Sequence, residues 1–249
     1  MNNLAATVLR REPLSPHLVR LALEVPGFVA TGVPDECVAL TLPGQPSRYY
    51  TVRRFEPNEM TIDVVLHDRG QISDWARGDV VGQRVQVRES TGPFALPNGA
   101  WWLYLVGDLT AAPAMARIIE TVGPDFHVAA WVEAPEPISG YFPGWFEGQG
   151  NLTWLEPGTS LAEWVECLPW PDADGYLWMA GEAAQMRAAR RYLAGPHGLP
   201  ASAQHVMGYW SAIQKRVDPG PIYAAGKAAG KSDEQIWAEY DALRQAEDD

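Results

Sequence analysis

The spacing of apolar segments changes near residue 98, and this change limits what the chain can fold into. Before that point, short apolar or alternating segments recur roughly every ten residues between Pro, Gly and Asp turns. This spacing predicts an antiparallel β-barrel or sandwich. A short helix is expected at 72–77, where Ser73 and Asp74 stand near the start. The expected strands are 18–23, 37–42, 48–53, 60–66 and 84–89.

After Pro97-Asn98-Gly99, continuous apolar runs alternate with segments of helical composition. Alternating strands and helices predict a parallel sheet of βαβ type, whose ligands bind beyond the carboxyl ends of the strands. We therefore predict a barrel domain over 1–98, an α/β domain over 99–215 and a tail with a helix over 216–249. The expected strands are 101–106, 126–132, 151–155, 176–180 and 204–207, and the expected helices are 111–122, 161–165 and 183–193.

Composition excludes several classes of function. The net charge of −12 argues against nucleic acid and anionic membrane as partners. There is no apolar run long enough to span a membrane, and the N-terminus has no basic segment followed by an apolar one. We therefore expect a cytoplasmic protein without membrane insertion. Cys37 and Cys167 show no C-x-x-C spacing, which argues against a metal centre or an iron–sulfur cluster.

The hexapeptide at 48–53, R-Y-Y-T-V-R, carries groups that suit a flavin nucleotide. Arg48 offers a planar fork for phosphate. Tyr50 shares its strand face and offers a ring for stacking, and Thr51 offers a hydroxyl to a ring nitrogen. The alternative is an ordinary barrel strand with an exposed arginine.

A second motif lies one strand later, where His67 ends a strand and Gly70 precedes a helix containing Ile72 and Ser73. Free N–H groups at such a turn suit a phosphate, and Ser73 adds a hydroxyl. The alternative is a histidine with ordinary hydrogen bonds at a strand end.

Three further motifs end predicted strands of the second domain. Two are strand-to-helix turns, which also read as plain turns with an N-cap residue. The third carries two adjacent aromatic residues that suit stacking on a flat ring, with core packing as the alternative. They are Gly107-Asp108 with Thr110, Gly181-Glu182, and Gly208-Tyr209-Trp210.

Taken in this order, the motifs resemble the siderophore-interacting protein family, a branch of the ferredoxin–NADP reductase-like flavoproteins. The carrying segments are R-Y-Y-T-V-R, H-D-R-G-Q-I-S-D-W-A, G-D-x-T-A-x-P-A, W-M-A-G-E and G-Y-W. The resemblance covers about residues 5–213. It implies an antiparallel FAD-binding β-barrel followed by a parallel-sheet NAD(P)-binding-like domain.

The resemblance also implies roles for individual residues. The flavin would be held by Arg48, Tyr50, Thr51 and Val52, and its remaining parts and pyrophosphate by His67, Gly70, Ile72 and Ser73. The nicotinamide side would be bordered by Asp108, Thr110, Gly181 and Glu182. The exposed flavin face would be covered by Tyr209 or Trp210.

Some positions depart from the family pattern, which usually has Glu at Leu109. The other departures are at Cys37, Ala39, Gln71, Ala112 and Ser211, the position after G-Y-W. Glu156 stands where NADPH users often carry Arg, which favours NADH, since a carboxylate suits a ribose diol.

The sequence thus predicts an FAD-dependent ferric-siderophore reductase. Electrons would come from NAD(P)H or a ferredoxin, and no side chain is assigned as a catalytic acid, base or nucleophile. Lys215, Arg216 and the arginines at 187–191 are candidates to attract an anionic ferric siderophore. Two alternatives stay open: a flavin reductase for another acceptor, and a flavin-free binding protein on the same fold.

Overall fold

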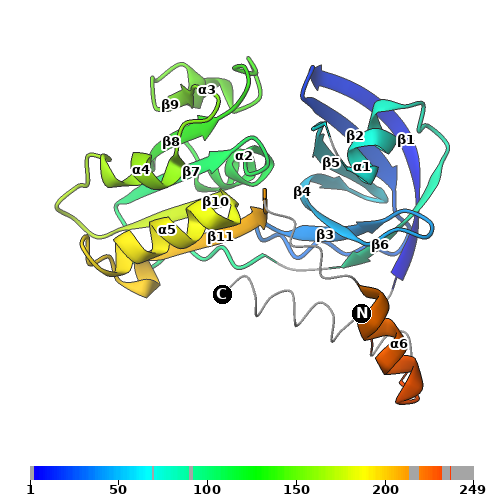
Figure 1. Cartoon of the computed structure of the whole chain (residues 1–249). Helices are drawn as coiled ribbons and strands as arrows, with labels where there is room; N and C mark the ends of the chain where they lie inside the picture. Colours follow the sequence, from blue (N-terminus) through cyan, green and yellow to red (C-terminus); the bar gives the residue numbers. More distant parts are fainter. Residues whose placement is uncertain (1–2, 69, 90–91, 213–218, 232–235, 237–249) are drawn as a thin grey trace.

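The computed structural model describes residues 3–68, 70–89, 92–212, 219–231 and 236. Two parts lie side by side, a barrel and a layered α/β part (Figure 1). A helix of the tail, α6 (Pro219–Ala228), lies on the barrel side. The final helix expected from Ser232 to Gln245 lies outside the described residues, apart from Ile236.

Six antiparallel strands close the barrel in the order β1-β2-β5-β4-β3-β6. The turn between β4 and β5 contains Asn58, which has a φ of 67°, a left-handed conformation that Asn tolerates well. Helix α1 (Gln71–Arg77) follows β5 and covers the barrel with Ile72 and Ala76. The strands are β1 (Asn3–Ser15), β2 (Leu18–Glu24), β3 (Cys37–Thr41), β4 (Arg48–Glu56), β5 (Glu59–Val65) and β6 (Arg84–Glu89).

The α/β part is a five-stranded parallel sheet in the order β11-β10-β7-β8-β9. Central strands β7 and β10 are buried along their whole length, as expected for a parallel sheet covered on both faces. The strands are β7 (Trp102–Asp108), β8 (His127–Glu133), β9 (Leu152–Leu155), β10 (Gly175–Glu182) and β11 (Gln204–Trp210).

Helices cover both faces of this sheet. On one face, α2 packs on Leu103 and Leu105; on the other, α4 and α5 pack on Tyr104 and Val106. The helices are α2 (Ala112–Val122), α3 (Gly144–Glu147), α4 (Leu161–Glu166) and α5 (Ala183–Ala194), and a 3₁₀ turn, η1, spans Ala201–Ala203.

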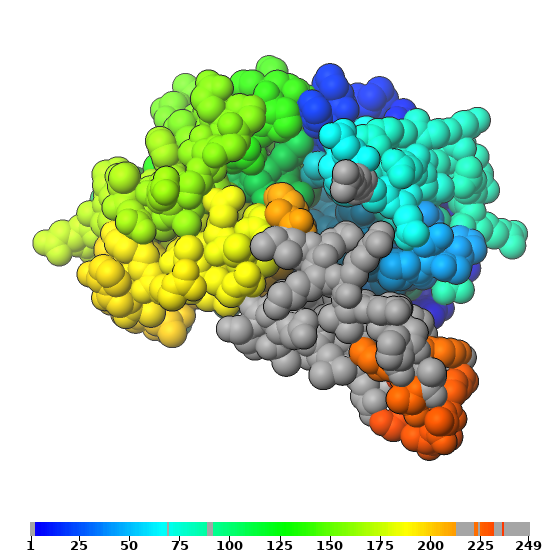
Figure 2. Space-filling view, viewed as in Figure 1, coloured from blue at the N-terminus to red at the C-terminus, as the bar shows by residue number. Residues whose placement is uncertain are grey.

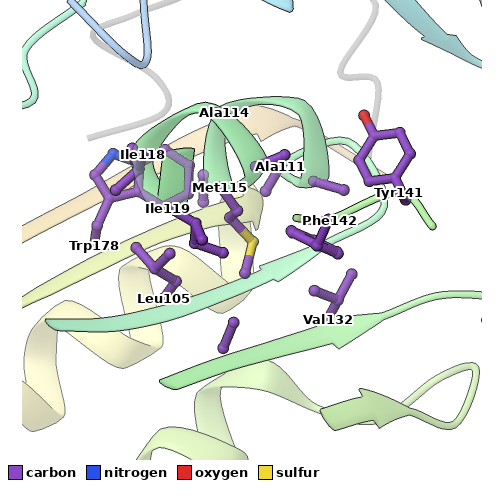
Figure 3. Close-up of a cluster of buried hydrophobic side chains, with 14 of the residues drawn as sticks. Leu105, Ala111, Ala114, Met115, Ile118, Ile119, Val132, Tyr141, Phe142 and Trp178 are labelled. Atoms are coloured by element: carbon purple, nitrogen blue, oxygen red, sulfur yellow. The ribbon is translucent and has the colours of Figure 1, made fainter. Parts of the chain in front are cut away.

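Helix α2 lies between the sheet and the barrel. Met115, Ile118 and Ile119 point down onto the sheet, with Trp178 beside them (Figure 3). The same buried cluster includes Leu18 of the barrel, so the apolar core around α2 extends into the barrel.

Polar bonds cross the seam between the two parts at several points. Trp178 Nε1 donates to Asp35 Oδ2 at 3.1 Å, and the Tyr141 hydroxyl donates to Asp63 Oδ2 at 2.7 Å. The Asp63 carboxylate also binds Arg20 through two hydrogen bonds. The orange end of β11 reaches the surface along this seam (Figure 2).

The predicted fold class, an antiparallel barrel followed by a parallel-sheet domain, is confirmed. The thirteen-residue strand β1 was missed, because Arg10, Arg11 and Glu12 interrupt its alternation and much of it is exposed. The expected turns at Gly107-Asp108 and Gly181-Glu182 belong to the last residues of β7 and β10.

Candidate flavin site

The carboxyl ends of β7, β10 and β11 face strands β3 and β4 of the barrel. At this edge the side chains of Tyr209 and Thr51 make a polar contact. Thr51 is buried, and Tyr209 is half-buried with its ring edge-on to Trp178 at 6.2 Å. Burial raises the pKa of the Tyr209 phenol, so it stays protonated at neutral pH. Two motifs more than 150 residues apart in the chain therefore meet across the seam.

The predicted flavin strand presents different groups on its two faces. Arg48 is exposed, and its Nη1 donates to the Ser47 carbonyl at 2.9 Å. Burial raises the pKa of Tyr50, while the nearby Arg48 charge lowers it, which places the two side chains close together. Thr51, one residue on, points to the sheet part. A cation and an aromatic ring thus lie on one face, and a hydroxyl lies on the other.

His67 and the start of α1 form a second group on the barrel. Ser73 Oγ accepts from the His67 N–H and donates to the His67 carbonyl, both at 2.9 Å. The Ser73 hydroxyl, which the sequence predicts to bind a phosphate, thus bonds the backbone of His67 in this structure. A Cβ added at Gly70 would lie 2.4 Å from His67 Cε1, so the imidazole packs directly on this glycine.

No side chain among the described residues caps α1. The first N–H groups of this helix are therefore left for solvent or a ligand. Ile72 is buried and fixes the helix on the barrel.

Asp108 organises the end of β7. Its Oδ1 accepts from the Thr110 N–H at 2.9 Å and from Thr110 Oγ1 at 2.5 Å. Its Oδ2 accepts from Trp210 Nε1 at 2.6 Å. The carboxyl is 6% exposed, so burial raises its pKa, and these three hydrogen bonds oppose that shift.

Gly181 and Glu182 complete the same edge. A Cβ on Gly181 would lie 2.8 Å from Asp108 Oδ2, so only glycine lets β10 approach this carboxyl. Glu182 caps α5 by accepting from the Gln185 N–H at 3.0 Å, and also accepts from the Ala212 N–H at 3.3 Å. Both predicted residues hold the shape of the edge.

The structure therefore forms two groups from the predicted residues. Thr51, Asp108, Thr110, Gly181, Glu182, Tyr209 and Trp210 gather around the seam. His67, Gly70, Ile72 and Ser73 gather at the start of α1. Arg48, Tyr50 and Val52 lie on the strand that carries Thr51.

Three residues at this place were not predicted. Cys37 is the cross-strand neighbour of Thr51 and lies near Tyr209. Asp35 accepts from Trp178 Nε1 and from the Phe94 N–H. Arg117 Nη1 donates to the Val52 carbonyl at 2.5 Å. An alternation pattern carries no signal for such long-range contacts.

These groups fit an FAD. The exposed Arg48 guanidinium and the uncapped start of α1 suit a pyrophosphate. Tyr50, Tyr209 and Trp210 offer aromatic surface for an isoalloxazine ring, and Thr51 offers a hydroxyl to its polar edge. Among the described residues no three His, Cys, Asp or Glu side chains gather where they could hold a metal ion.

A cavity of about 380 Å³ lies elsewhere, at the amino ends of the sheet strands. Its walls include Trp101, Trp102, Tyr104 and His127. Because ligands of parallel sheets bind at the carboxyl ends, this cavity is distinct from the candidate flavin site. In the described part of the chain, no helix is both long and apolar enough to cross a membrane.

Comparison with known proteins agrees with the fold. The model of the siderophore-interacting FAD-binding domain matches residues 43–94, and the siderophore-interacting protein model matches residues 100–212. Together they match more than half of the chain. The chain therefore belongs to the siderophore-interacting protein family, as predicted.

Curated relatives extend this result. The mycobactin import ATP-binding/permease protein IrtA of Mycobacterium tuberculosis is 30% identical over 223 residues, which are 83% of this chain and 26% of IrtA. The chain thus spans about a quarter of the length of the first such relatives. The ferric vibriobactin reductase ViuB of Vibrio cholerae is 28% identical over 173 residues, covering 66% of this chain and 64% of ViuB.

Solved structures give the same fold. A siderophore utilization protein from T. fusca is 25% identical with a TM-score of 0.73, covering 87% of this chain and 95% of that one. The siderophore-interacting protein of Acinetobacter baumannii has the same TM-score at 21% identity, covering 92% and 99%. Neighbours also include ferredoxin reductases. The expected class, an FAD-dependent oxidoreductase on a ferredoxin reductase-like fold, agrees with these findings.

Proposed function

We propose that the chain is an FAD-dependent ferric-siderophore reductase that releases Fe(II) from an imported siderophore in the cytoplasm. The observation that carries the proposal is the contact between Thr51 and Tyr209, which brings the predicted flavin strand together with the aromatic end of β11. Family membership supports the cofactor and the siderophore together.

When bound, FAD supplies hydride acceptance and the transfer of single electrons. The chain's own residues bind and orient it. Arg48 and the start of α1 hold the phosphates, while Tyr50 and Thr51 hold the ring system. Asp108 fixes Trp210 beside the seam through the 2.6 Å bond, which restricts how an acceptor reaches the ring. No side chain is required as an acid, base or nucleophile.

The substrate's own chemistry then favours release. Hard oxygen donors hold Fe(III) more tightly than Fe(II), because Fe(III) carries the higher charge. A one-electron reduction therefore loosens the complex without any bond to the protein.

For the electron donor we propose NADH before NADPH, with a ferredoxin as the other candidate. Glu156 is exposed directly after β9. Glu133, at the end of β8, accepts from the Gly158 N–H at 2.8 Å. Two carboxylates at this edge disfavour a 2′-phosphate and tolerate a ribose diol.

For the siderophore we propose attraction by the arginines of α5. Arg190 and Arg191 are exposed on this helix, and Arg187 is half-buried. Lys215 and Arg216, the other two candidates, lie outside the described residues. A local basic surface within a chain of net charge −12 would attract an anionic complex.

The test starts with the absorption spectrum of the purified protein, reconstituted with FAD if colourless. NADH is added without oxygen, then ferrioxamine or ferric 2,3-dihydroxybenzoate, with a colorimetric Fe(II) chelator present. Bleaching by NADH, followed by reoxidation and trapped Fe(II), supports the proposal. If NADH bleaches the flavin and only a quinone reoxidises it, the protein is a flavin reductase for another acceptor. A protein that stays colourless with FAD would indicate a flavin-free binding protein.

A further inference from the structure

The hydrogen-bond ladder between β3 and β4 stops beside the candidate flavin site. Its last pair is Cys37 with Thr51. The Val52 N–H still donates to the Glu36 carbonyl at 2.8 Å, but the Glu36 N–H turns back to the Val33 carbonyl at 3.0 Å. The Val52 carbonyl therefore lacks the Glu36 N–H, which would be its donor if the ladder continued by one more residue pair. A buried carbonyl without a partner is costly, so something must replace it.

Helix α2 supplies that replacement. Arg117 Nη1 donates to the Val52 carbonyl at 2.5 Å. Burial lowers the pKa of this guanidinium, and nearby Glu36 opposes the shift, so Arg117 remains charged. A charged donor on a backbone carbonyl is a strong hydrogen bond.

The same face of α2 also binds Arg53, the residue of β4 that follows Val52. Glu120, three positions after Arg117, accepts two hydrogen bonds from Arg53 at 3.0 and 2.7 Å. The Arg53 side chain is 12% exposed and lies over the Tyr141 ring. The register between β4 and β5 shifts at this residue, so Arg53 is an extra residue in the strand. Bulges of this kind redirect neighbouring side chains.

Helix α2 also begins at the other half of the site. It starts at Ala112, directly after the Asp108–Thr110 turn that binds Trp210. One rigid helix therefore connects the strand that carries Thr51 with the turn whose Asp108 binds Trp210.

We propose that Arg117 is a positioning residue for the flavin: it fixes the Val52 peptide and thereby sets the direction of the Thr51 hydroxyl. Glu120 supports it by fixing Arg53. The inference rests on the proposed function, because it assumes that FAD lies against Thr51. It assigns to a helix of the second domain a role in binding a cofactor held by the first.

The experiment compares FAD binding to the full-length apoprotein of Arg117→Met and Arg117→Lys. Arg54→Met is the matched control, because Arg54 lies on the same strand in an exposed ion pair with Glu56. The readouts are the dissociation constant of FAD, the shape of the long-wavelength flavin band and the midpoint potential. Arg117→Met should bind FAD about tenfold more weakly, with a shifted band. Arg117→Lys should restore part of the FAD affinity and part of the wild-type flavin band, since lysine keeps the charge but lacks the planar guanidinium.

An Arg117→Met protein with the wild-type dissociation constant, band and potential would overturn the inference. So would an equal loss in Arg54→Met. If Arg117→Met fails to fold, Glu120→Gln replaces it: a shifted flavin band supports the inference, and an unchanged band overturns it. A wild-type protein that binds no FAD would instead overturn the proposed function, and the inference with it.

Discussion

Trp210 donates its indole N–H to the Asp108 carboxylate at 2.6 Å, so the last residue of β11 is tied to the last residue of β7. The indole is 46% exposed, while the carboxylate is buried. A large aromatic ring is thus held at the surface by a buried acceptor. The bond fixes the ring beside the seam where Tyr209 contacts Thr51.

Trp210→Phe is expected to destabilise the fold by about 1–3 kcal/mol, because the buried carboxylate loses one of its hydrogen-bond donors. Urea denaturation followed by circular dichroism measures the change. Trp101→Phe is the control, since Trp101 is also an exposed tryptophan but lies at the amino end of the sheet. Equal losses in the two variants would contradict the role of the Asp108 bond.

The stability of the protein should depend on pH through Asp108. Burial raises the pKa of its carboxyl in the folded state, so the folded protein takes up this proton more readily than the unfolded chain. The stability from protonated Asp108 is present below the unfolded pKa, and it is lost as pH rises through the folded pKa.

The comparison is with Asp108→Asn, which lacks this proton. As pH falls from neutral toward the unfolded pKa of about 4, wild type should gain stability relative to the variant. Denaturation of both proteins at a series of pH values measures the difference between their unfolding free energies. The titration of the other carboxylates is common to both proteins and cancels in this difference. A difference that is constant with pH, or that moves the other way, would contradict the raised pKa.

Thr51→Val and Tyr209→Phe should each remove the same polar contact across the seam. Each is expected to cost about 1 kcal/mol in unfolding free energy, and the double variant should cost less than the sum. Thermal or urea denaturation of the four proteins completes the cycle. Strict additivity would show that the two side chains act independently.

Arg48→Met should weaken FAD binding by about tenfold or more while changing stability by no more than about 0.5 kcal/mol, because the side chain is exposed. Fluorescence titration of apoprotein with FAD measures the first quantity. Arg84→Met provides the comparison, since Arg84 is an exposed arginine on another barrel strand. An unaffected FAD affinity would remove Arg48 from the proposed phosphate site.

Much of the fold could be predicted because its signals are local. The change from short strands to alternating strands and helices marked both architectures, and Gly181 and Asp108 marked the ends of central strands. The motif order also placed Thr51 and Tyr209 near one ligand. Their direct contact agrees with that expectation, while the flavin roles themselves remain predictions.

The parts that escaped prediction depend on long-range geometry. Strand β1 is specified by pairing with β2 and β6 more than by its own alternation. Arg117 looks like an ordinary helix residue, and its partner is a backbone carbonyl 65 positions earlier. Ser73 shows a related case, because a hydroxyl predicted to bind a ligand also bonds the backbone of His67, six positions earlier.

The shared core around α2 has a practical consequence for handling this molecule. Leu18 of the barrel is part of the same buried cluster as Met115, and Arg117 completes the backbone bonding of β4. A protease cut at the Pro97–Gly99 turn would therefore leave two fragments that remain bound to each other. Expressing either fragment alone would expose the apolar surface that the two parts bury against each other, and this exposure would favour aggregation.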